Sequence, residues 1–261
     1  MKITWVLLIL FSSQILQAQT SGPDARQLTD PKSIHSKAAA EAREIPIEDL
    51  YFTRSIFSAA WSPDGKEIAF TTDMSGRLNL WKMNTSGGWP VQLTQSDETQ
   101  AGGTWSPDGK WLVYQQDVGG NEQYDLYAIP ANGGQIVNLT NTPDIREQDA
   151  RWSPDGKSLA VIYKAKQSTV FDIAILDWGT HKIMNLTKEE TPDHLWGVGN
   201  AFGSIWSPDG KSLYANRTIT GFTDADIYAI DVSSGKKTNL TPHESQVINI
   251  ISSLSPDGKT I

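Results

Sequence analysis

The hexapeptide W-S-P-D-G-K, first found at residues 61–66, occurs four times in the chain, and a fifth copy has Leu in place of Trp. The copies stand at 61–66, 105–110, 152–157, 206–211 and 254–259. Their starting points are 44, 47, 54 and 48 residues apart. Repeats at this interval are typical of propeller blades or helical arrays. The chain is therefore built from repeated units.

The residues around each hexapeptide favour strands. Ser-Pro-Asp-Gly suits a type I turn followed by a left-handed glycine, which closes a tight β-hairpin. In the first repeat, short strand-like stretches at 55–62, 67–73, 78–84 and 91–95 surround this turn. Helical 3.6-residue periodicity is absent. The pattern predicts an all-β fold, a β-propeller of four-stranded blades.

The predicted blades cover about 55–95, 101–140, 148–187 and 200–242, and an incomplete fifth covers 247–261. A fifth half-blade has no place in a four-bladed ring, so we expect further blades beyond Ile261. First strands carry small residues such as Ala59 and Gly103, which we expect near a crowded central axis. The repeated Trp is then predicted to pack between neighbouring blades. Carbohydrate stacking by these Trp residues is the alternative.

The N-terminus has the pattern of a secretory signal peptide. Lys2 precedes an apolar stretch at residues 3–11, and a polar segment ends at Ala18, where we expect cleavage. An uncleaved anchor is the alternative, but the apolar stretch is shorter than the roughly 20 residues that span a bilayer. Residues 19–50 are predicted to form a lead and a short helix at about 30–43. We therefore expect an exported protein, periplasmic or extracellular, without a membrane span.

Composition excludes several classes of site. The chain has 261 residues, a net charge of −8, 38% hydrophobic residues and no cysteine. An acidic chain without a Lys/Arg run is a poor nucleic-acid binder. The absence of Cys excludes disulfides, thiolate metal sites and a thiol nucleophile. The four His residues lack metal-ligand spacing, so we expect no metal and no cofactor.

Several segments resemble known propellers. The W-S-P-D-G-K repeats with their N-L-T strand endings resemble those of TolB and of prolyl oligopeptidase family serine peptidases. Residues 45–62, 78–94, 116–130 and 191–196 are similar to bacterial dipeptidyl aminopeptidase/acylaminoacyl peptidases. The resemblance implies a propeller that gates and positions short peptides for a C-terminal α/β-hydrolase domain carrying Ser, Asp and His.

The sequence itself holds no catalytic motif of that family. The pair Gly199 and Gly203 has the spacing of G-x-S-x-G, but Ala201 stands where the Ser belongs. We therefore expect no catalytic residue in this chain, and its partners to be short peptides and its own hydrolase domain. The alternatives are a TolB-like periplasmic protein-interaction propeller and a carbohydrate- or ligand-binding propeller.

The long, variable connections of a propeller are where binding is usually built. They contain the candidate substrate or partner residues, which are Glu122, Asp125, His194, Trp196 and Asp224. The alternative is that these are solvated loop residues. Glu189 and Glu190 invite comparison with an acidic pair that binds a substrate amine in dipeptidyl-peptidase relatives, but their surroundings favour a solvated charge pair.

Overall fold

The computed structural model describes residues 46, 48, 53–191, 193–197, 204–219 and 221–261. The chain divides between Phe52 and Thr53, and every named strand belongs to Thr53–Ile261. The predicted signal peptide at 1–18, the lead at 19–29 and the helix at 30–43 lie outside the described residues.

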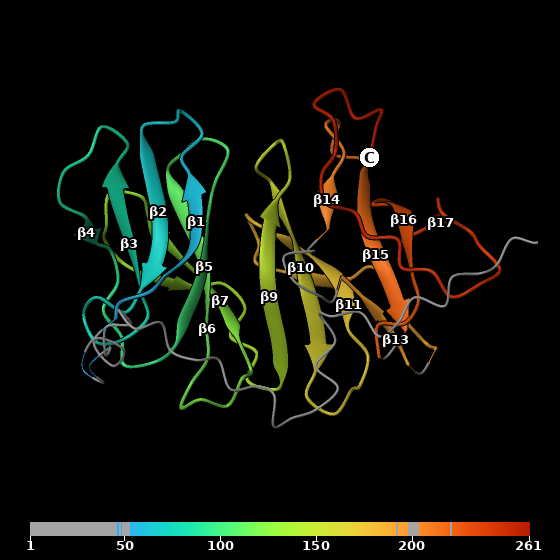
Figure 1. Cartoon of the computed structure of the whole chain (residues 1–261), viewed down its shortest axis with the longest axis horizontal. Helices are drawn as coiled ribbons and strands as arrows, with labels where there is room; N and C mark the ends of the chain where they lie inside the picture. Colours follow the sequence, from blue (N-terminus) through green and yellow to red (C-terminus); the bar gives the residue numbers. More distant parts are fainter. Residues whose placement is uncertain (1–45, 47, 49–52, 192, 198–203, 220) are drawn as a thin grey trace, which may run out of the picture. The chain divides into compact units, whose positions relative to one another are not determined.

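Four antiparallel sheets follow one another along the chain, and Figure 1 shows them in the order of the sequence colours. The first contains β1 (Ile56–Trp61), β2 (Glu67–Thr72), β3 (Asn79–Asn84) and β4 (Val91–Gln92). The second contains β5 (Gln100–Trp105), β6 (Trp111–Gln116), β7 (Asp125–Pro130) and β8 (Val137–Asn138). The third contains β9 (Ile145–Trp152), β10 (Ser158–Ala165), β11 (Asp172–Asp177) and β12 (Ile183–Asn185). The fourth contains β13 (His194–Trp196), β14 (Ile205–Trp206), β15 (Ser212–Ile219), β16 (Ala225–Asp231) and β17 (Lys237–Asn239). These sheets are the blades of a β-propeller, so the predicted fold class is confirmed.

Each S-P-D-G turn is closed by the same set of hydrogen bonds. In the first blade the Gly65 amide donates to the Ser62 carbonyl at 2.9 Å, and the Ser62 hydroxyl donates to Asp64 Oδ1 at 2.7 Å. Gly65 has a φ of 70°, the left-handed conformation that glycine adopts without strain. The Ser and Asp side chains bond within the turn, and Gly supplies its left-handed conformation. These three requirements explain why the same residues recur in every copy.

The apolar core lies between blades rather than within them. One cluster joins Leu80 of the first blade to Trp105 and Leu112 of the second. A second cluster joins blades two and three, and a third joins blades three and four. A lone four-stranded sheet would leave these faces in water, so each blade depends on its neighbour.

The repeated Trp packs on the preceding blade, as the sequence predicts. Trp105 is 7% exposed, and its indole Nε1 donates to the Ala60 carbonyl at 3.1 Å. Trp206 makes the same bond to the Arg151 carbonyl at 2.9 Å. Trp61 follows no earlier blade in the described chain and is 64% exposed. Burial of this residue type therefore depends on having a blade in front of it.

A second inter-blade link is made by the backbone. At each junction an amide of the inner strand, or of Asn249 at the last junction, donates to a carbonyl of the preceding blade. The acceptor is the residue just before the third strand or, in blade four, the first residue of that strand. The four bonds are Gln100 to Leu78 at 3.3 Å, Glu147 to Tyr124 at 2.8 Å, Trp196 to Phe171 at 3.0 Å and Asn249 to Ala225 at 2.8 Å. The last bond shows that the segment 247–251 docks on blade four as earlier inner strands dock on theirs.

Small residues line the inner strands where we expected them. Ala59, Gly102, Gly103 and Ala150 border a cavity of about 510 Å³. A Cβ on Gly103 would lie 2.8 Å from Leu80 Cδ1 of the preceding blade, so no larger residue fits without a shift. The close approach of β5 to β3 of blade one, together with the φ of 136° at Gly103, thus favours glycine here.

The fourth blade starts earlier than the expected residue 200. Its inner strand is split into β13 and β14, which pair with the two ends of β15. His194 and Trp196, which we placed in a long connection, are therefore strand residues. The longer interval of 54 residues before this hexapeptide accommodates the interrupted strand.

Substitution of Trp105 by Ala should cost about 3–5 kcal/mol in the free energy of unfolding, because it removes a buried aromatic ring and a hydrogen bond to the neighbouring blade. The matched variant Trp61→Ala changes the same repeat position but should cost less than about 1 kcal/mol. Urea unfolding measured by far-UV circular dichroism compares the two. Equal losses would contradict packing between blades.

Candidate functional site

The strands bring two kinds of connection to opposite ends of the blades. The turn end carries the S-P-D-G turns and the turns between third and fourth strands. The connection end carries the links between second and third strands and the links from one blade to the next. Antiparallel order fixes this separation in every blade.

The two ends differ strongly in charge. The connection end holds eleven acidic residues and three basic ones, counted over 73–78, 93–99, 117–124, 139–144, 166–171, 186–193, 220–224 and 240–246. The turn end holds four acidic and six basic residues, counted over 62–66, 85–90, 106–110, 131–136, 153–157, 178–182, 207–211 and 232–236. The negative charge of the protein is therefore concentrated at the connection end.

Two of the predicted site residues lie at the connection end of blade two. Glu122 is well exposed, and its Oε2 is 3.7 Å from Arg146 Nη1. Arg146 also lies over the ring of Tyr124, at 5.0 Å from its centroid. Asp125 instead accepts hydrogen bonds from Asn138 Nδ2 and the Thr142 amide. Glu122 is thus available to a partner, whereas Asp125 has a structural role.

The role of Asp125 recurs in other blades. An Asp that begins or nearly begins the third strand binds an Asn thirteen residues later and a Thr fifteen residues later. These sets are Asp125, Asn138 and Thr140; Asp172, Asn185 and Thr187; and Asp226, Asn239 and Thr241. The Thr hydroxyl oxygen also accepts the next amide of the third strand. The N-L-T ending therefore fastens the fourth strand to the third.

Trp196 is buried rather than presented to solvent. It is 0% exposed and contacts the ring of Tyr228 edge-on at 5.2 Å between centroids. Its indole Nε1 donates to Glu189 Oε2 at 2.8 Å. His194 lies two residues earlier in β13, where it pairs with Ile219. The structure thus separates these two residues from Glu122 and Asp125, and the five candidates do not converge.

Glu189 is not the solvated acid that the sequence suggested. Its side chain is 5% exposed and accepts from Arg217 Nε at 2.7 Å and Nη2 at 3.1 Å. Burial alone would raise the pKa of Glu189, but the hydrogen bonds from Arg217 and Thr191 outweigh it and lower the pKa to about 2. Glu190, the next residue, is exposed. The expected pair is therefore one buried ion-pair partner and one surface carboxylate.

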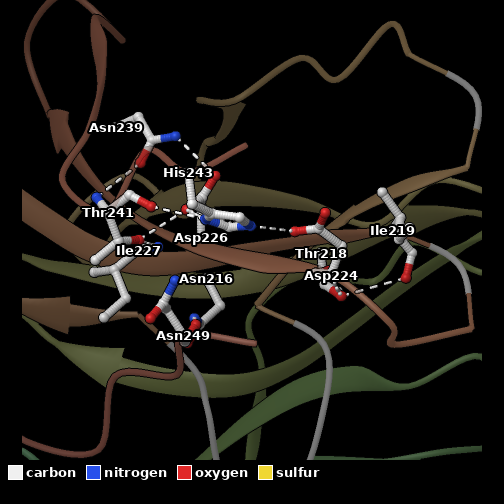
Figure 2. A network of polar contacts seen from close by, with 10 residues as sticks. All are labelled: Asn216, Thr218, Ile219, Asp224, Asp226, Ile227, Asn239, Thr241, His243 and Asn249. Atoms are coloured by element: carbon white, nitrogen blue, oxygen red, sulfur yellow. Dashed lines mark hydrogen bonds and ion pairs between the residues drawn. The ribbon is translucent and has the colours of Figure 1, made fainter. Parts of the chain in front are cut away.

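His243, which the sequence did not single out, stands between two carboxylates. Its Nε2 is 3.0 Å from Asp224 Oδ1, and its Nδ1 is 3.1 Å from Asp226 Oδ1, as Figure 2 shows. Nδ1 also faces the Thr241 carbonyl at 3.0 Å. Asp224, the fifth predicted residue, thus binds a histidine at the connection end of blade four. Because both ring nitrogens are occupied, His243 has no free nitrogen to act as a general base.

A buried carboxyl lies between blades two and three. Glu147 is completely buried, and its Oε1 accepts from the Thr142 hydroxyl at 2.6 Å. Burial raises the pKa of Glu147 from 4.5 to about 7, the Thr142 hydrogen bond opposes this, and the Asp125 carboxylate adds to it. The junction therefore contains a group that is largely protonated at slightly acidic pH.

A groove of about 630 Å³ lies between blades three and four. Glu189, Arg217 and Trp196 line it, together with Lys188 and Lys237. Lys237 Nζ lies 5.5 Å from the centroid of the Trp196 ring. The ion pair of Glu189 with Arg217 and the buried indole of Trp196 thus form part of the groove wall.

Two features are absent from the described part of the chain. There, no group of three or more His, Asp or Glu side chains has an arrangement that would hold a metal ion. Over the same residues, no helix has the length and apolar character needed to cross a membrane.

The family model described as "TolB beta propeller domain" matches residues 47–195, which is more than half of the chain. The chain belongs to the TolB β-propeller domain family. The predicted recognition is therefore confirmed at the level of the propeller. A search of curated proteins finds no match.

Solved structures give the same fold. TolB from Acinetobacter baumannii is 26% identical with a TM-score of 0.55, and the match covers 78% of this chain and 47% of that one. A prolyl endopeptidase has a TM-score of 0.59 at 15% identity, covering 74% and 30%. A puromycin-hydrolyzing peptidase from Mycobacterium tuberculosis has a TM-score of 0.56 at 16% identity, covering 75% and 30%. The chain thus spans about half the length of this TolB, and its likeness to the peptidases shows the fold alone.

The spacing of polar residues in the TolB-type repeat distinguishes structural Asp residues from candidate binding residues. Asp, Asn and Thr recur at fixed offsets of thirteen and fifteen residues, which marks Asp125 and Asp226 as structural. No comparable offset links Glu189 to Arg217, because their contact joins two blades. Such a pair is visible only once the blades are packed.

Replacement of Glu189 by Gln should destabilise the protein by about 1.5–3 kcal/mol at pH 7, because it breaks a charged hydrogen-bonded pair. The neighbouring variant Glu190→Gln should change stability by less than about 0.5 kcal/mol. Since the folded pKa of Glu189 is lowered, its contribution is present above the ordinary glutamate pKa and is lost as pH falls towards 2. Urea unfolding at pH 7, 5 and 3 should show the wild-type advantage over Glu189→Gln shrinking. An advantage independent of pH would contradict this assignment.

Proposed function

We propose that this propeller is the non-catalytic module of an exported serine peptidase, and that its connection end gates and positions short peptides for an α/β-hydrolase domain. The observation that carries the proposal is the charge contrast between the two ends, eleven acidic residues to three basic ones at the connection end. A field of one sign attracts the opposite charge and orients it. Peptides with a free terminal ammonium or basic side chains fit such a face.

Two carboxylates at the connection end have side chains that are exposed and can contact a peptide. Glu122 has only a 3.7 Å contact with Arg146 and is well exposed, and Glu190 is exposed beside the groove between blades three and four. Asp125, Asp172 and Asp226 are instead committed to their own blades. Peptide contacts are therefore assigned to exposed carboxylates of the connections, with Glu122 first among the original candidates.

A TolB-like protein-interaction propeller is the second candidate. The 26% identity with TolB from Acinetobacter baumannii and the matching family model favour it. The two candidates differ in the size of the partner. A peptide-positioning module binds short cationic peptides, whereas an interaction propeller binds a folded protein surface and leaves short peptides unbound. Export, expected from residues 1–18, is common to both.

Binding of a fluorescent cationic tetrapeptide to this chain should weaken about threefold or more in the double variant Glu122→Gln/Glu190→Gln. It should also weaken on raising the salt concentration, because exposed charges are screened. Fluorescence anisotropy measures both effects.

The matched control puts the same charge change at the turn end. The variant Trp89→Lys/Gln135→Lys also raises the net charge by two, at two exposed positions, and should leave affinity within about twofold. Affinity that is equal in both double variants, or no binding of the peptide at all, would contradict the proposed function.

A further inference from the structure

The connection after each fourth strand is tied to the third strand at one fixed position. Seventeen residues after the first polar residue of the third strand, a group donates to its side-chain oxygen. At three junctions this donor is a main-chain amide, from Ser96 to Asn79 at 2.8 Å, from Thr142 to Asp125 at 2.9 Å and from Glu189 to Asp172 at 2.7 Å. At the fourth junction the imidazole of His243 takes this place as an ion pair, with Nδ1 3.1 Å from Asp226 Oδ1. An amide does not titrate near neutral pH, whereas an imidazole does.

The surroundings of His243 require it to be charged. Nδ1 faces the Thr241 carbonyl and the Asp226 carboxylate, and Nε2 faces the Asp224 carboxylate. All three are acceptors. A neutral imidazole has one N–H and would turn a lone pair towards an acceptor on its other side. Only the imidazolium satisfies both sides.

Among the described residues, two charged groups face His243, and both are carboxylates. Asp226 is the second residue of β16, and Asp224 directly precedes this strand. The other residues drawn in Figure 2 are uncharged, and they include Asn239 and Asn249. Glu244 follows in the sequence and is exposed. The Thr241 carbonyl raises the pKa of His243, burial opposes this, and Asp224 and Asp226 add to the rise.

The same two carboxylates flank the docking point of the next inner strand. Ala225 lies between them, and its amide donates to the Val247 carbonyl at 3.0 Å while its carbonyl accepts from Asn249 at 2.8 Å. Asn216 adds two bonds to this segment, to the Asn249 carbonyl at 2.7 Å and from the Ile251 amide at 3.1 Å. A change in the position of 224–226 therefore reaches 247–251 directly.

We propose that His243 is a pH-sensitive latch, whose imidazolium holds residues 224–226 in the position that docks the segment 247–251 on blade four. Deprotonation leaves two carboxylates 3.0–3.1 Å from a neutral ring and loosens this junction. Because the charged form is the one favoured by folding, the latch is closed below the ordinary histidine pKa near 6.5. It opens as pH rises through the higher pKa of the folded protein. The junction of blades one and two, tied by the Ser96 amide, stays closed over the same range.

Hydrogen–deuterium exchange of the intact chain tests the latch. Between pH 6 and pH 8.5, after correction for the intrinsic exchange rate, protection of peptides covering 247–251 should fall about threefold or more. Protection of 100–105, the equivalent inner strand of blade two, should change less than twofold. A fall of the same size in both segments would overturn the proposal, since it would report general loosening.

Three variants complete the test. His243→Gln should remove the pH-dependent step at 247–251, and Asp224→Asn should move it to lower pH, since one attracting charge is lost. Asp224→Asn alters a side chain whose identified partner is His243, so it keeps the test valid if His243→Gln does not fold. His181→Gln, at the turn end, should behave like the wild type. A step that persists unchanged in Asp224→Asn, or one abolished by His181→Gln, would overturn the proposal.

Discussion

From the second blade onward, each described blade of this propeller is held by burial of an apolar face against the blade before it. The core clusters lie between sheets, and Trp105 and Trp206 place an indole N–H on the carbonyl of an inner strand of the preceding blade. Apolar burial drives this packing, and in blades two and four the indole hydrogen bond adds to it. In blade three the equivalent Trp152 Nε1 is buried with no identified hydrogen-bond partner, so burial alone holds that indole. The contrast between buried Trp105 and exposed Trp61 follows from this single dependence.

The blade junctions combine a fixed frame with a few variable positions. The frame consists of the Asp–Asn–Thr sets and the backbone bond from each inner strand to the preceding blade. Within it, one inner-strand position is occupied in turn by Gln100, Glu147, Trp196 and Asn249. Because the frame satisfies the backbone, these side chains are free to differ. The side chain at this position therefore differs from one junction to the next at the connection end, while the fold stays the same.

Much of the fold was predictable because it rests on short-range signals that repeat. Ser62, Asp64 and Gly65 each have a local reason to form the turn, and the repeated turn marks the start of each blade along the chain. The split inner strand of blade four was missed, since the sequence between 188 and 199 resembles an ordinary connection.

The candidate site was less predictable because its contacts span strands or blades. The connection end was inferred correctly as the place of the longer links, but Trp196 is core and Asp125 is a strand fastener. Arg217 and His243 acquire their partners only through packing and were not singled out. Residue type and loop position did not separate exposed Glu122 from buried Glu189, whose environments differ through tertiary contacts alone.

The most direct measurement of the central claim is solvent exchange of the tryptophan indole N–H protons by nuclear magnetic resonance. If each blade is held by the one before it, the indole protons of Trp105 and Trp206 exchange slowly, because they are bonded to Ala60 and Arg151, and that of Trp61 exchanges rapidly. Equally rapid exchange at all three positions would show that the indoles do not join the blades, and would contradict the account.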